Sequence, residues 1–327
     1  MHLVVLAIVI FTSLIWTIKK KYGNQRELFE ADQEPTIYVS VASYRDASCN
    51  ATIRQLVDRA KYPSRLFFGI CEQHDPADRA CLQPDTFKQK VDPSHFRVTV
   101  LPPDQARGPM YARRLIHKMY KNEDFYLQID SHMIPVQDWD VKLIDQARLC
   151  PQPSCLSTYP LQYDDPDIET NSKVAVFRKA VRGKNNLPIF KAEKIPRPST
   201  PVKTACAAAG FVFLPKSAAQ MPLWPYLPNL FQGEESIMAA QLWTRGIDIY
   251  CPSINIFSHK YYRKGEHKFW DNKPASFWDE QKKSEAFARR LITIDFPVIR
   301  PGSSDVALGT TRPISEWFER IFLHKGK

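Results

Sequence analysis

Glycine is scarce in this sequence, with 11 residues among 327, whereas proline occurs 26 times. This balance excludes long glycine-rich flexible segments and favours many rigid loops. The seven cysteines form no C-x-x-C pair and are widely scattered. They do not have the pattern of a small disulfide scaffold, although Cys150 and Cys155 are close enough in sequence to pair.

Signatures of nucleic-acid binding are also missing. The chain has no Cys/His zinc-finger spacing, no basic heptad region and no aromatic RNA-binding motif. Its formal net charge is nevertheless +10, which favours either an anionic partner or simple solubility. A nucleotide sugar is a compact anion that would suit a basic cleft, so we expect no nucleic-acid partner.

Long apolar runs are absent beyond the first residues. Positions 3–18 are apolar except for three hydroxyl residues, and three lysines follow at 19–21. A membrane-spanning helix needs about 20 residues, so this run is marginal unless the lysines snorkel. A cleaved signal peptide is the alternative, but a basic n-region and a clear cleavage site are lacking.

We therefore expect a single-pass anchor over 1–18, a polar stem over 19–34 and a catalytic domain over 35–327. The positive-inside rule would keep the domain cytosolic, whereas an ER or Golgi enzyme has the reverse orientation. The sequon at 50–52 does not decide between the two sides of the membrane.

The domain alternates strand-like and helix-like segments. β-Branched or aromatic runs predict strands, and apolar residues at helical spacing predict helices. The expected strands are 36–41, 65–71, 96–101, 125–130, 205–214, 247–250 and 255–259, and the expected helices are 50–61, 111–120, 139–149, 232–243, 280–292 and 314–323. This order predicts an α/β fold with a mainly parallel sheet, whose ligands bind at the carboxyl ends of the strands. A Pro/Lys-rich insert at 160–203 is expected to close over the site or to contact the acceptor.

The segment Asp130-Ser131-His132 directly follows a hydrophobic strand. Residues two apart project from the same side of an extended backbone, so Asp130 and His132 can bind one cation. A carboxylate with an imidazole suits Mn²⁺ or a similar divalent ion, which would hold a diphosphate. The alternative is an aspartate that caps the next turn, with the histidine on the surface.

Four further residues complete the predicted reaction centre. His259 ends an apolar segment and is the candidate third metal ligand, or else a structural histidine. Arg263 offers a guanidinium that binds phosphate bidentately. Glu234 and Glu235 open a predicted helix, where acidic residues also suit the helix dipole; as functional groups they would orient sugar hydroxyls.

Other polar residues follow predicted strands or flank the helix expected at 111–120. Such positions lie at the sheet edge where a nucleotide docks, although a solvated helix face is the alternative for Arg107 and Arg113. The candidate donor-binding residues are Ser43, Tyr44, Arg45, Asp75, Arg107, Arg113 and Asp130.

Several segments together resemble a known family. They are V-S-V-A-S-Y-R-D (39–46), G-I-C-E-Q-H-D (69–75), A-R-G-P-M-Y-A-R (106–113), Y-L-Q-I-D-S-H-M (126–133), F-Q-G-E-E (231–235) and S-H-K-Y-Y-R (258–263). The chain is similar to the α-N-acetylglucosaminyltransferases that include the hydroxyproline-modifying enzyme, and more distantly to the polypeptide α-N-acetylgalactosaminyltransferases. One departure is Met110, where that family often has cysteine.

The resemblance implies a GT-A fold, a UDP-sugar donor, with UDP-GlcNAc expected, and transfer to a protein or glycan hydroxyl with retention of configuration. It implies Mn²⁺ or another divalent cation on Asp130, His132 and His259. By the same resemblance Arg45 and Asp75 would lie near uridine, Arg113 near the donor, and Glu234 and Glu235 near the transferred sugar. The alternatives are a glycoside hydrolase with a carboxylate pair and a non-catalytic, membrane-tethered carbohydrate-binding module.

Overall fold

The computed structural model describes residues 35–322 apart from 79, 83–86, 88, 164–167, 272 and 293–307. Contacts within the chain separate residues 1–35 from a compact unit, Thr36–Lys327, to which all that follows refers. The expected anchor at 1–18 and stem at 19–34 lie outside the described residues.

The predicted single-pass membrane localisation has to be corrected. Within the described ranges, no helix is long and apolar enough to cross a bilayer. The apolar run that motivated the prediction covers only 3–18, which is shorter than the roughly 20 residues that a span needs. The described residues therefore do not support a single-pass anchor.

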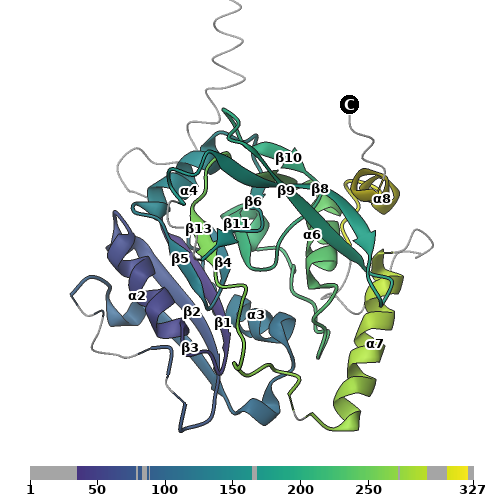
Figure 1. Ribbon diagram of the computed structural model, residues 1–327, viewed down its shortest axis with the longest axis horizontal. Helices are drawn as coiled ribbons and strands as arrows, with labels where there is room; N and C mark the ends of the chain where they lie inside the picture. Colours follow the sequence, from purple (N-terminus) through teal and green to yellow (C-terminus); the bar gives the residue numbers. More distant parts are fainter. Residues whose placement is uncertain are drawn as a thin grey trace, which may run out of the picture. The chain divides into compact units, whose positions relative to one another are not determined.

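An eight-stranded sheet forms the centre of the unit, with strand order β10-β12-β6-β11-β4-β1-β2-β3 (Figure 1). Its strands are β1 (Ile37–Tyr44), β2 (Leu66–Gln73), β3 (Phe96–Leu101), β4 (Phe125–Asp130), β6 (Ser154–Ser157), β10 (Val202–Thr204), β11 (Phe211–Pro215) and β12 (Asp248–Cys251). Strands β4, β1, β2 and β3 run parallel to one another, and β12 runs parallel to β6. Strand β11 pairs antiparallel with β4 and β6, and β10 pairs antiparallel with β12. The predicted mainly parallel α/β sheet is confirmed.

Side chains that alternate along the strands form two cores, one on each face of the sheet. In β1, Ile37 and Val39 join the core that contains α2 (Cys49–Arg59) and α4 (Trp139–Arg148). Tyr38 points to the opposite core, with α3 (Pro109–Lys118) and α6 (Glu234–Thr244). The period-two burial thus separates the two helical layers.

The remaining helices and small sheets surround this centre. Helices α7 (Ala275–Ile292) and α8 (Ile314–Phe322) pack against the core that contains α6, and α5 (Lys216–Ala219) follows β11. Strands β5 (Met133–Pro135), β13 (Phe257–His259) and β7 (Leu161–Gln162) form a three-stranded sheet in the order β5-β13-β7. Short 3₁₀ turns cover Pro63–Arg65, Pro93–His95 and Pro103–Gln105.

The proline- and lysine-rich insert contains regular structure, which the sequence analysis did not predict. Strands β8 (Lys173–Arg182) and β9 (Pro188–Pro196) pair antiparallel as a hairpin, with an irregularity between Phe177 and Lys179. Val174 and Val176 are buried in the core on the α6 side. The prolines occupy the ends of β9, where they interrupt no central hydrogen bond.

Two cysteines that are far apart in the sequence form a disulfide. Cys49 at the start of α2 forms a disulfide with Cys81, whereas Cys150 and Cys155 are buried as free thiols. Asn50 of the sequon is buried, and its amide donates to the Cys81 carbonyl at 2.9 Å. In this fold Asn50 has no room for a glycan.

Candidate active site

Two strand ends bring the three predicted metal ligands together. Asp130 is the last residue of β4, and His132 follows two residues later. Strand β13 runs antiparallel to β5 with His259 opposite Met133, which places His259 beside His132. The two imidazole rings lie 4.6 Å apart between centroids. One ligand atom from each of Asp130, His132 and His259 lies within 4.8 Å of the others.

A buried carboxylate, Asp46, orients the His132 ring through a hydrogen bond to its Nδ1. The His132 Nδ1–H donates to Asp46 Oδ2 at 2.7 Å, and Ser131 Oγ donates to the same oxygen at 2.5 Å. Burial alone would raise the pKa of Asp46, but the hydrogen bond and charge of His132 outweigh it and lower that pKa to about 2. A carboxylate on one imidazole nitrogen fixes the ring and leaves the other nitrogen for a metal.

Arg113 connects the predicted metal site to the first turn of α6. Its guanidinium donates to Asp130 Oδ1 at 2.7 Å and to Glu234 Oε1 at 2.5 Å. Arg113 and Glu234 are each only 3% exposed, so this is a buried ion pair. Burial raises the pKa of Glu234, while His259 and Arg113 hold the pKa of Asp130 below its usual range against the opposite effect of burial.

Glu235, next along α6, is held by groups from two other segments. Tyr159 donates its hydroxyl to Glu235 Oε2 at 2.6 Å, and the Ala209 amide donates to Oε1 at 3.0 Å. Burial raises the pKa of Glu235 to about 7. Sequence reasoning missed Tyr159, which follows β6 within an otherwise uninformative proline-rich stretch.

The predicted nucleotide-binding residues lie at the carboxyl ends of β1 and β2. Ser43 and Tyr44 end β1, and Arg45 follows with a left-handed φ of 47°. The Arg45 guanidinium contacts Asp75 at 3.0 Å and Asp78 at 2.7 Å. The structure therefore brings Arg45 and Asp75 together, as an ion pair at the sheet edge; their contact with uridine stays a prediction.

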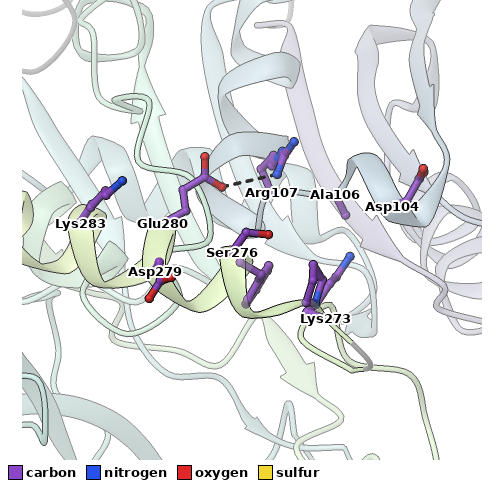
Figure 2. A pocket seen from close by; sticks show the side chains of 10 residues that line it. Asp104, Ala106, Arg107, Lys273, Ser276, Asp279, Glu280 and Lys283 are labelled. Atoms are coloured by element: carbon purple, nitrogen blue, oxygen red, sulfur yellow. Dashed lines mark hydrogen bonds and ion pairs between the residues drawn. The ribbon is translucent and has the colours of Figure 1, made fainter.

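Arg107 lies apart from this cluster, before α3. Figure 2 shows Arg107 in a pocket between the segment 104–107 and the first turns of α7. The pocket has a volume of about 460 Å³, and Arg107 pairs there with Glu280 at 3.5 Å. Lys273 of the same pocket lies 6.0 Å from the Tyr44 ring centroid, so the pocket adjoins the end of β1. A contact between Arg107 and the nucleotide stays a prediction.

Arg263 lies beside Asp46, the carboxylate that holds His132. Its Nη2 lies 3.4 Å from Asp46 Oδ2, and its Nε donates to Glu266 at 2.5 Å. The phosphate contact expected of Arg263 stays a prediction.

The three ligands fit a divalent cation. A carboxylate oxygen with two imidazole nitrogens suits Mn²⁺ or Zn²⁺. His259 Nδ1 is a buried nitrogen without a hydrogen-bond partner among the described residues. Gly210 leaves the space around Asp130 open, because a Cβ there would lie 2.6 Å from Asp130 Oδ2.

Comparisons with known proteins agree with this architecture. The sequence model of the family "Glycosyltransferase (GlcNAc)" matches residues 36–96 and 86–325. The structure is similar to GalNAc-T7, solved with UDP, GalNAc and Mn²⁺, at a TM-score of 0.53 and 13% identity over 79% of this chain. The match covers 48% of that protein, so this chain spans about half its length.

S. aureus TarS 1-349, solved with UDP-GlcNAc, matches with a TM-score of 0.49 and 13% identity, over 80% of this chain and 71% of that chain. The search of curated proteins gave no match. At 13% identity, the likeness to GalNAc-T7 shows only that the GT-A fold is shared. The match to the family model covers most of the chain and therefore shows the family. The chain belongs to the GlcNAc glycosyltransferase family.

Proposed function

We propose that the chain is a metal-dependent, retaining glycosyltransferase that moves N-acetylglucosamine from UDP-GlcNAc to a hydroxyl of a protein or glycan. The observation that carries the proposal is the convergence of Asp130, His132 and His259, with Asp46 fixing His132 from behind. The resemblance to the hydroxyproline-modifying enzymes supports N-acetylglucosamine as the sugar. GalNAc-T7, whose fold is shared, is solved with UDP and Mn²⁺.

In this proposal Asp130, His132 and His259 would hold Mn²⁺, which supplies Lewis-acid stabilisation for a departing diphosphate. Arg113 keeps Asp130 ionised and in place, because its guanidinium is bonded to that carboxylate. Arg263 sits beside Asp46, where a donor phosphate would compete for its guanidinium with Glu266.

The transfer itself needs few protein groups. The bond from the anomeric carbon to the phosphate oxygen breaks, and the acceptor oxygen bonds to the same carbon from the same face. The acceptor proton passes to the departing phosphate oxygen, so no separate general base is required. Glu234 and Glu235 lie at the start of α6, where they would orient sugar hydroxyls.

The hydrolase alternative fits the site less well. A glycosidase uses two carboxylates, one as acid and one as nucleophile or base. Here Asp130 and Glu234 share the guanidinium of Arg113, which ties both up in a single ion-pair network. The family match likewise supports a transferase.

The first experiment measures UDP release by the full chain from UDP-GlcNAc, UDP-GalNAc and UDP-glucose, with Mn²⁺ and with EDTA. We expect slow hydrolysis of UDP-GlcNAc in Mn²⁺ that EDTA abolishes. Equal turnover in EDTA would contradict metal dependence, and preference for another sugar would contradict the assigned donor. Lys118→Glu, an exposed change at the end of α3, is the control that should behave as wild type.

A further inference from the structure

The β8–β9 hairpin concentrates the positive charge of the chain. We call residues 173–196 the basic hairpin. This segment has seven basic residues and one acidic residue, a net charge of +6 within a chain of net charge +10. The basic residues are Lys173, Arg178, Lys179, Arg182, Lys184, Lys191 and Lys194. Such a concentration produces a local field that attracts an anionic partner.

The pairing of the two strands places two of these positive charges opposite each other. Lys179 lies directly opposite Lys191, and both side chains are exposed. Like charges directly opposite each other destabilise a strand pair. Within the described ranges neither lysine has a carboxylate partner, whereas Arg178 pairs with Glu193. The lysine pair therefore has no stabilising role in the hairpin, which favours a role in binding.

The buried face of the hairpin packs against the candidate active site. The Phe177 ring lies 4.8 Å from the ring of Tyr159, whose hydroxyl binds Glu235. Ser236 of α6 donates to the Pro188 carbonyl at 2.6 Å. Figure 1 shows β8 and β9 running beside α6.

The tip of the basic hairpin also packs against the start of α6. Leu187 fills the space next to Gly233, the residue that precedes Glu234. The tip of the hairpin thus adjoins the end of α6 where the sugar would be transferred. An acceptor chain that places its hydroxyl there has the hairpin as a neighbouring surface.

We propose that the exposed face of the basic hairpin binds an acidic stretch of a polypeptide acceptor. The proposal rests on the proposed transferase function, because it gives the acceptor for that same site. Charge complementarity defines the chemistry of the partner, and the attachment of the hairpin to α6 favours an acceptor over a membrane surface or a nucleic acid.

The test uses three hydroxyl-bearing peptides of equal length, flanked by glutamate, glutamine or lysine. Binding to the full chain is measured by fluorescence anisotropy without any donor, at several salt concentrations. We expect wild type to prefer the glutamate peptide, and Lys179→Glu to weaken that binding by about three- to tenfold, the range of one to a few exposed charge pairs. The salt dependence should also become less steep.

The variant carries its own control for folding. Lys179→Glu places a carboxylate opposite Lys191, which should maintain or raise the thermal stability of the hairpin. Lys118→Glu makes the same change of charge on an exposed residue of α3, and it should leave peptide binding within about twofold of wild type, as expected of a surface charge outside the basic hairpin.

Several results would overturn the proposal. They are equal affinity of wild type for the glutamate and lysine peptides, no effect of Lys179→Glu, and an equal loss with Lys118→Glu. A fourth is an effect of Lys179→Glu on binding to phosphatidylserine vesicles or duplex DNA but not to the peptide. UDP release without acceptor is measured in parallel, so a failure of the transferase proposal is recognised separately from a failure of peptide binding.

Discussion

The buried bridge from Arg113 to Asp130 and Glu234 gives the most quantitative prediction. Arg113→Met removes the guanidinium that contacts both carboxylates at 2.7 and 2.5 Å. Asp130 remains in contact with His259, but Glu234 is 3% exposed and loses its ion pair with Arg113. Breaking a buried pair in this way costs about 3–5 kcal/mol of unfolding free energy.

The pH dependence of that penalty has a definite sign. Burial already raises the pKa of Glu234, and loss of Arg113 raises it further. A carboxyl with a raised folded-state pKa favours the folded state below its unfolded pKa, and this contribution is lost as pH rises through the folded pKa. The penalty of Arg113→Met should therefore be larger at pH 8 than at pH 5.

A double-mutant cycle of Arg113→Met and Glu234→Gln, followed by urea denaturation, tests this prediction. The double variant should be less destabilised than the sum of the single variants, with a coupling of about 2 kcal/mol. Lys118→Met on the same helix is the exposed control and should change stability by at most about 0.5 kcal/mol. Additive single effects, or a penalty that grows toward low pH, would refute the reasoning.

Three further predictions address other parts of the structure. Gly210→Ala should abolish metal-dependent UDP release, because the new Cβ would lie 2.6 Å from Asp130 Oδ2. It should also lower the free energy of unfolding by about 1–3 kcal/mol. Normal turnover would contradict this prediction. Tyr159→Phe should move the acidic limb of the pH–rate profile to higher pH, because burial raises the pKa of Glu235 to about 7 and the opposing hydrogen bond is lost; an unchanged profile would exclude ionised Glu235 from the reaction. Trp139→Ala should lower the unfolding free energy by about 3–5 kcal/mol in urea denaturation, since this side chain is fully buried; a loss below about 1 kcal/mol would show that the core is not packed as described.

The part of the fold and site that follows from local pattern could be predicted from the sequence. Strands such as Phe96–Leu101 and Phe125–Asp130 have the bounds that their hydrophobic runs indicate. Asp130 and His132 were recognisable because they lie two positions apart, directly after a hydrophobic strand. Their approach to His259 depends on the pairing of β13 with β5, which no local pattern specifies.

Features that depend on tertiary contacts were missed. Asp46 follows the candidate Arg45, but its role depends on how the loop after β1 meets His132. The strand expected at 205–214 begins only at Phe211, because Gly210 and its neighbours pass close to Asp130 and Glu235. The hairpin in the insert was hidden by its prolines, which lie at strand ends.

Binding of Mn²⁺ tests the central claim most directly. Electron paramagnetic resonance of the full chain with UDP should show one bound ion, and Asp130→Asn should weaken its binding strongly, since it removes a charged ligand. Lys118→Glu should bind as wild type does. Mn²⁺ binding that is unchanged by Asp130→Asn would contradict a metal site on Asp130, His132 and His259.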